Sequence, residues 1–232
     1  MTRSVQEHAP GRAPWWVLLR PQSRRGIVRS EVSVKEWAAE LPSVGRVRPK
    51  RCPDCKRASH PLGGKIVLQG HGRRERQLRG PAAPNEAPEL LVLLVRRYRC
   101  TICGALCTVG PRELLTQRLY TASAIGWALA LFGVLGLAAA AVRQLVSPWA
   151  IWGVSARRWP TLLRWVKAIR SRRLWRCVRP APLWWTARQL AERAATTIAA
   201  LALPSLEPPP IEVQAFHGAA RANSWPTIRA AR

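Results

Sequence analysis

Hydrophobic and polar residues follow different patterns in the two halves of the chain, and the first half has the pattern of β-strands. Residues 66–68 form a short apolar, β-branched run, residues 73–78 are polar, and residues 90–98 form a strongly β-prone stretch. A loop rich in Pro and Gly at residues 80–84 separates the last two stretches. Because such loops join neighbouring strands, the pattern predicts an antiparallel pairing here.

The second half has the pattern of helices. Residues 121–142 carry no charged side chain, and their length alone admits a membrane-spanning helix. However, most of these residues are Ala, Gly, Ser or Thr, and Ile125, Leu129 and Phe132 follow the spacing of one helical face. The same spacing starts again after two glycines. We therefore predict two short buried helices joined by a Gly-containing turn, with a membrane span as the alternative.

A third helix is predicted at residues 155–169, with Pro160 in its first turn. Its apolar residues fall on one face and its basic residues on the other, and further arginines flank it. The apolar residues are Leu162, Val166 and Ile169, the opposing ones are Arg164 and Lys167, and the flanking ones are Arg157, Arg158, Arg170, Arg172 and Arg173. Such a helix is suited to rest on a core and enter a DNA groove, and a solvated basic helix is the alternative.

Four of the six cysteines form two C-x2-C pairs, Cys52 with Cys55 and Cys100 with Cys103. Two thiolates at this spacing hold one metal ion from a tight turn, and two such pairs complete a tetrahedral site. The predicted antiparallel strands lie between the pairs and would bring them together, as in a zinc ribbon. We therefore predict one structural Zn²⁺ per chain.

Other assignments of the cysteines and histidines are weaker. Two separate pairs of reduced thiols are one alternative, and a cluster in which Cys107 replaces one ligand is another. Cys177 stands alone in a basic stretch and is expected to be an ordinary thiol. His60 and His71 are expected to be exposed loop residues.

Together these patterns predict an α+β fold, with a small antiparallel zinc ribbon followed by an all-α helix-turn-helix bundle. The predicted segments are an N-terminal extension at 1–50 with a short strand (15–19) and helix (30–41), the ribbon at 51–110, the helix-turn-helix at 113–176, a helix at 184–203, and a disordered Pro-rich tail at 204–232.

The charge of the chain indicates a polyanionic partner. Its formal net charge is +26, from 38 basic and 12 acidic residues. No Asp or Glu occurs from Leu114 to Ala191, an interval that contains twelve arginines and lysines. A field of one sign attracts nucleic acid first and anionic lipid second, so double-stranded DNA is the expected partner.

The residues around the cysteines resemble a known family. CPDC at 52–55, GHGRRERQLRG at 70–80 and RRYRCTIC at 96–103 resemble the N-terminal zinc ribbon of bacterial insertion-sequence transposases. VSARRWPTLLRW at 154–165 is similar to the start of the recognition helix that follows that ribbon. The resemblance implies that the four paired cysteines bind zinc and that Arg164 and Lys167 face DNA.

The catalytic part of that family has no counterpart in this sequence. Strand transfer needs three carboxylates that hold two divalent metal ions. Asp54 is the only aspartate, and beyond Glu113 the glutamates are Glu192, Glu207 and Glu212. The sequence also contains no Ser-His-Asp set, phosphate loop or HExxH helix. We therefore expect DNA binding without catalysis.

The N-terminus has no pattern of a signal peptide, which favours a cytoplasmic protein with reduced cysteines. The expected function is thus a cytoplasmic, transposase-like DNA-binding protein, for which a homodimer is compatible with the sequence. A membrane-anchored zinc-ribbon protein with a span at 121–142 and a zinc-stapled adaptor that binds other proteins are the alternatives.

Overall fold

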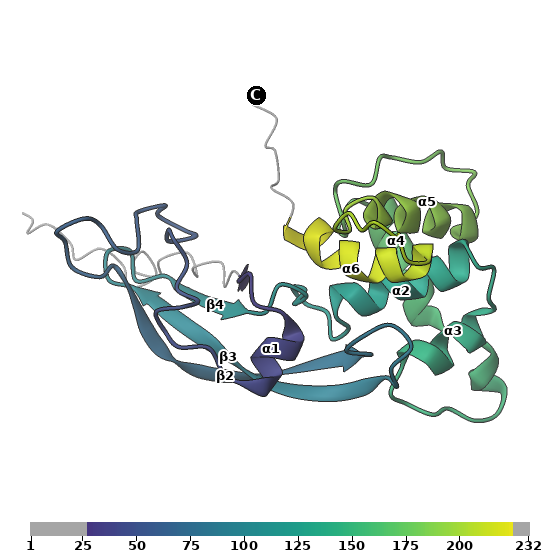
Figure 1. Cartoon of the computed structure of the whole chain (residues 1–232), viewed down its shortest axis with the longest axis horizontal. Coiled ribbons are helices and arrows are strands. Elements are labelled where there is room, and N and C mark those ends of the chain that lie inside the picture. The colour runs from purple at the N-terminus through teal and green to yellow at the C-terminus, as the bar shows by residue number, and fades with distance from the viewer. Residues whose placement is uncertain (1–26, 225–232) are drawn as a thin grey trace, which may run out of the picture.

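The computed structural model describes residues 27–224, which adopt an α+β fold (Figure 1). This part of the chain contains one four-stranded sheet and six α-helices. The strands are β1 (Ile27–Arg29), β2 (Leu68–Gly80), β3 (Glu89–Cys100) and β4 (Leu106–Gly110). The helices are α1 (Val34–Ala39), α2 (Ala122–Gly133), α3 (Ala139–Val146), α4 (Pro160–Arg170), α5 (Ala187–Ala199) and α6 (Ile211–Ser224), with a 3-10 helix, η2 (Val154–Arg157), before α4.

A long hairpin of β2 and β3 is the main element of the sheet. The strands pair antiparallel from Leu68 opposite Cys100 to Gly80 opposite Glu89, with a bulge between Gly70 and Arg73. The predicted antiparallel pairing is therefore confirmed, and the loop at residues 81–88 joins the two strands. Figure 1 shows one end of the hairpin beside the helices and the other end far from them.

The sheet differs from the prediction in being mixed. Its strand order is β1-β4-β3-β2, and β4 pairs antiparallel with β3, but β1 runs parallel to β4. The amide of Ser30 continues this pairing by donating to the carbonyl of Gly110. A parallel pairing is possible here because β1 and β4 are separated by a long stretch of chain rather than joined by a hairpin. The predicted strand at residues 15–19 lies outside the described residues.

Helix α1 forms within the region predicted to be helical. Ser33 is its N-cap and accepts a hydrogen bond from the amide of Glu36. The indole of the buried Trp37 donates to the carbonyl of Leu94 and fixes α1 against β3.

The uncharged stretch forms two helices, α2 and α3, as predicted. Gly136 lies in the connection with φ of 70°, a conformation that glycine adopts without strain. Nearly every residue of α2 is buried, so this helix is apolar all round and occupies the centre of the helical part. Within residues 27–224, no helix is both long and apolar enough to cross a membrane.

Helix α4 begins at Pro160, and its apolar face is buried as predicted, with Leu162, Val166 and Ile169 each almost inaccessible. The connection between α3 and α4 covers residues 147–159 and contains η2. A helix-turn-helix has a turn of about 3–4 residues. The arrangement of α3 and α4 therefore departs from the short-turn geometry that the sequence pattern predicted.

The C-terminal part of the chain corrects one prediction. Residues 211–224, placed in a disordered tail, form helix α6, which packs against α2 and α5. The run of three prolines that indicated disorder ends at Pro210, whose carbonyl accepts hydrogen bonds from the amides of Val213 and Gln214. Ala215, Phe216 and Ala219 are buried in the helical core. The helical part therefore extends well beyond residue 176, because α2 buries its faces against α5 and α6.

The buried apolar side chains form two separate clusters. One contains residues up to Leu114 and is formed by the sheet, by α1 and by the segments around the two C-x2-C pairs. The other begins at Leu115 and belongs to α2–α6. The two clusters correspond to the arrangement in Figure 1, where α2–α6 gather at one side of the molecule and most of the sheet, with α1, lies at the other.

Candidate metal centre

Four cysteine sulfurs converge at the end of the β2–β3 hairpin away from the helices. The Sγ atoms of Cys52, Cys55, Cys100 and Cys103 all lie within 4.8 Å of one another. Cys52 Sγ is 3.7 Å from Cys103 Sγ, and Cys55 Sγ is 3.8 Å from Cys100 Sγ. Sulfurs at the corners of a tetrahedron with Zn–S bonds of about 2.3 Å lie about 3.8 Å apart. The donor set and its spacing therefore fit a tetrahedral zinc ion.

The two pairs sit on backbone turns of the same design. The amide of Cys52 donates to the carbonyl of Arg57, and that of Cys100 donates to the carbonyl of Ala105. The carbonyl of Cys52 accepts a hydrogen bond from the amide of Lys56, four residues later, and the carbonyl of Cys100 accepts one from the amide of Gly104. Lys56 and Gly104 have φ of 62° and 72°. Each loop is thus a closed turn that holds both of its sulfurs on one side.

Strand pairing brings these two turns together. Cys100 is the last residue of β3 and lies opposite Leu68, the first residue of β2. The amide of Thr101 donates to the carbonyl of Val67, and the amide of Val67 donates to the carbonyl of Ser59 in the first loop segment. These hydrogen bonds connect the first loop to the second through the start of β2.

Backbone N–H groups act on the first cysteine of each pair and oppose the effect of burial on its pKa. Burial raises the pKa of the Cys52 thiol to about 12, although the N–H groups of Asp54 and Cys55 act in the opposite direction. Burial also acts to raise the pKa of Cys100, but the N–H groups of Cys103 and Ile102 outweigh it and lower that pKa to about 7. Each loop therefore directs backbone N–H groups at its first sulfur, as a metal-binding thiolate requires.

The remaining cysteines and histidines lie outside this cluster. Cys107 is buried on β4, where burial raises the pKa of its thiol to about 11. Among the described residues, the sole group of three or more ligand-type side chains near enough to share a metal ion is the four-cysteine cluster. Cys177 is half-buried in the α4–α5 connection, and His60 and His71 are exposed, although His71 lies on β2 rather than in a loop.

Most of the basic residues predicted to contact DNA are exposed. Arg164 and Lys167 are exposed on α4 opposite its buried face, and Arg157, Arg158, Arg172 and Arg173 are exposed on either side of it. Arg170 is different, because its guanidinium donates to the carbonyls of Leu183 (2.8 Å) and Trp185 (2.6 Å). Arg170 thus holds the α4–α5 connection.

Sequence patterns missed two buried charged side chains. Arg143 is 4% exposed and donates to the carbonyls of Ile151 and Arg158, which holds the α3–α4 connection. The carboxylate of Glu113 accepts from the amide of Val34, the first residue of α1, and from Arg112. Their roles depend on hydrogen bonds to loop carbonyls and to a helix N-terminus, of which hydrophobic periodicity carries no signal.

Comparisons of the chain with protein-family models, with curated proteins and with solved structures gave no match. The site's own chemistry therefore carries the functional argument.

Proposed function

We propose that this chain is a DNA-binding protein in which a structural zinc ion stabilises the sheet and α4 contacts the duplex. The zinc would be held by the four clustered cysteines, and because these fill the tetrahedron they leave no position for a reactive water. The protein would bind DNA without catalysing a reaction, in the manner of the recognition part of an insertion-sequence transposase. The sheet and its two cysteine turns would correspond to the zinc ribbon of such a transposase.

One observation carries the proposal. Helix α4 rests on the helical core through Leu162, Val166 and Ile169, while Arg164 and Lys167 are exposed on its other side. This helix lies in the interval from residue 114 to residue 191 that has no acidic side chain. An exposed basic face on a rigidly packed helix is what a DNA groove accepts. The long α3–α4 connection means that α4 itself, rather than a short-turn helix pair, is the element proposed to enter the groove.

The two α4 side chains have distinct expected roles. Arg164 is suited to a bidentate contact with guanine, and Lys167 can reach a base or a phosphate. Arg157, Arg158 and Arg172 would contact the backbone irrespective of sequence. Arg170 is left out of this set, because its guanidinium is bonded to the 182–185 loop.

Fluorescence anisotropy on duplexes selected from a random pool, and on scrambled duplexes, tests the proposal at several salt concentrations. The affinity should fall by about 0.9 log unit per log unit of salt for each phosphate neutralised. Arg164→Ala should cost about 1–3 kcal/mol on the selected duplex and flatten the sequence preference. Lys35→Ala on α1 is the control for Lys167→Ala, since both remove an exposed helical lysine.

Two outcomes would count against the proposal. If the wild type shows no salt-dependent binding to either duplex, the DNA function fails. If Arg164→Ala loses the same affinity on selected and scrambled duplexes, α4 does not recognise bases, and its basic face contributes only to backbone binding.

A further inference from the structure

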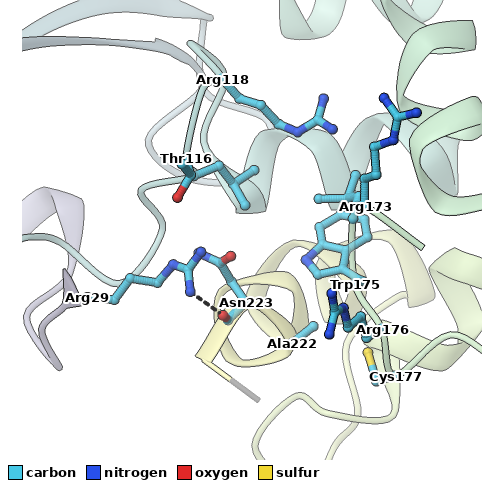
Figure 2. Close-up of a pocket in the computed structure, with 11 residues that line it drawn as sticks. Arg29, Thr116, Arg118, Arg173, Trp175, Arg176, Cys177, Ala222 and Asn223 are labelled. Carbon is cyan, nitrogen blue, oxygen red and sulfur yellow. Dashed lines mark hydrogen bonds between the residues drawn. The ribbon is translucent and has the colours of Figure 1, made fainter. Parts of the chain in front are cut away.

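A pocket lined by arginines lies where the sheet part meets the helices (Figure 2). Four separate segments form it: β1 with Arg29, the β4–α2 connection with Thr116 and Arg118, the α4–α5 connection from Arg173 to Cys177, and the end of α6. Its walls contain four arginines, Arg29, Arg118, Arg173 and Arg176, and no Asp or Glu among the described residues. Positive charge therefore converges in a concave site without a protein counter-ion.

One arginine fixes the base of the pocket. Arg29 Nε donates to the carbonyl of Leu114 (3.0 Å), and Arg29 Nη1 donates to the carbonyl of Asn223 at the end of α6 (2.8 Å). The dashed line in Figure 2 marks the second of these bonds. These bonds hold the Arg29 guanidinium in place. Because both acceptors are neutral carbonyls, the positive charge of the guanidinium is not neutralised.

The other three guanidiniums have no partner among the described residues. Among residues 27–224, no hydrogen bond or ion pair involves the side chains of Arg118, which is partly exposed, or of Arg173 and Arg176, which are exposed. Figure 2 shows the guanidiniums of Arg118 and Arg173 at the same side of the pocket. The buried indole N–H of Trp175, in the same wall, also has no acceptor. Buried donors in proteins are normally paired, so the unpaired N–H of Trp175 indicates that this wall lacks a group that accepts hydrogen bonds.

Burial changes the pKa of two arginines of the pocket. It lowers the pKa of both Arg29 and Arg118, because the charged guanidinium is removed from water without an opposing charge. A bound anion would restore that missing interaction.

The backbone around the pocket is strained. Gln117, Arg172 and Trp175 all have positive φ, of 59°, 56° and 46°. For a residue as bulky as tryptophan this conformation is a true outlier. Strain of this kind, on two connections that face the same pocket, places Arg118, Arg173 and Arg176 together at a cost to stability.

We propose that this pocket binds a phosphoryl group. Guanidiniums match the geometry of phosphate oxygens through paired N–H donors, and several of them converge here with no competing carboxylate. The cavity volume is about 250 Å³, below the range of about 300–1,000 Å³ for pockets that enclose a whole small molecule. A compact anion, or one phosphate of a longer chain, therefore fits better than a larger organic ligand.

A second cavity indicates how a longer phosphate chain would continue. It shares Thr116 with the pocket and is lined by three further arginines of the sheet, Arg74, Arg76 and Arg97. On the other side, Arg173 lies three residues after the end of α4. A nucleic-acid backbone bound in the pocket would thus have basic side chains on both sides. This source of the phosphoryl group rests on the proposed DNA function, whereas a free phosphate does not.

The experiment compares wild-type protein with Arg118→Gln and Arg176→Gln, and uses Arg73→Gln as the matched control. Arg73 is an exposed arginine of β2 that does not line either cavity. One arm measures binding of inorganic phosphate by calorimetry and by thermal unfolding, against sodium chloride of equal ionic strength. The other arm measures binding of duplex DNA by anisotropy at several salt concentrations.

The pocket variants should lose about tenfold in affinity, the loss expected for one charge-assisted hydrogen bond, while Arg73→Gln stays near wild type. A loss in the phosphate arm supports a free phosphoryl ligand. A loss in the DNA arm alone, with a salt slope reduced by about one, supports a backbone phosphate. Without phosphate, Arg118→Gln should unfold at the wild-type temperature or above, because it removes an unpaired charge.

The inference is overturned if both pocket variants match Arg73→Gln in both arms. It is also overturned if Arg118→Gln and Arg176→Gln both lower the unfolding temperature of the free protein markedly, since the arginines would then be structural. DNA binding by the wild type that the pocket variants leave intact sinks the pocket and keeps the proposed function. If the pocket variants lose phosphate binding but the wild type does not bind DNA, the pocket stands and the proposed DNA function fails.

Discussion

Each of the four clustered cysteines supplies one sulfur to the same small volume, so the loss of one ligand should release the metal. We expect the purified protein to carry about one zinc per chain, and Cys52→Ser or Cys100→Ser to lose it together with the fold of the sheet end. Elemental analysis and hydrogen exchange on β3 measure the two effects. Cys177→Ser is the control, because that thiol lies outside the cluster. Full zinc occupancy in the Cys52→Ser/Cys100→Ser double variant would refute the site.

Glu113 should make the stability of the protein depend on pH. Burial is the main cause that raises the pKa of its carboxyl above 4.5, although hydrogen bonds and Arg112 oppose it. The native state therefore binds this proton more tightly than the unfolded chain. The contribution of the carboxyl to stability is complete below pH 4.5 and is lost as the pH rises through the raised pKa.

Urea unfolding of wild type and Glu113→Gln between pH 4 and pH 7 checks this dependence. The stability of the wild type relative to the Gln variant should fall as the pH rises, and zinc release at low pH cancels in the comparison. Glu113→Ala should cost about 1–3 kcal/mol, because the amide of Val34 loses its acceptor. A wild-type advantage that grows with pH would show that the carboxyl is stabilised in its charged form.

At the scale of elements, α6 approaches α5 so closely that a methyl group does not fit between them. A Cβ at Gly218 would lie 1.8 Å from the carbonyl oxygen of Ile198. Alanine normally favours a helix over glycine by about 1 kcal/mol, but here the helices must separate. Gly218→Ala should therefore destabilise the protein by about 1–3 kcal/mol in thermal or urea unfolding.

The matched control for this substitution is Gly45→Ala, since a Cβ at that exposed position meets nothing within 4 Å. It should change stability by less than about 0.5 kcal/mol. An increase in stability on Gly218→Ala would mean that α6 does not pack against α5 as described.

Local sequence patterns predicted some elements of the fold and missed others. The β2–β3 hairpin, the division of the uncharged stretch into α2 and α3, and the buried face of α4 were all predictable, because each depends on local periodicity and turn residues. The convergence of the four cysteines was predictable from their spacing and from the strands between them. Helix α6 was missed because its buried face consists largely of alanines and glycine, which give a weak apolar signal next to a Pro-rich segment. The parallel β1 and the arginine pocket depend on distant segments, about which local patterns say nothing.

At the scale of the whole molecule, two separate apolar clusters predict two unfolding steps. The cysteine cluster belongs to the cluster of the sheet, and α2–α6 have their own. Removal of the proposed zinc ion by a chelator should therefore release the amides of β3 to hydrogen exchange while those of α2 stay protected, and helical circular dichroism should largely persist. Adding zinc back should restore protection of β3. Simultaneous loss of both signals in one transition would show that the two clusters fold as a single unit.

The position of α6 in the chain has a consequence for the order in which the protein is made. The last of the clustered cysteines is residue 103, and roughly 110 residues later α6 begins to supply the final wall of the core around α2. At about 5–20 residues per second, a ribosome needs roughly 5–20 s to cross that interval. During this time the proposed metal site has all four of its cysteines, whereas the apolar surface of α2 has been synthesised without the helix that covers it. The face of α2 that α6 covers therefore stays without its packing partner until the last helix has been synthesised.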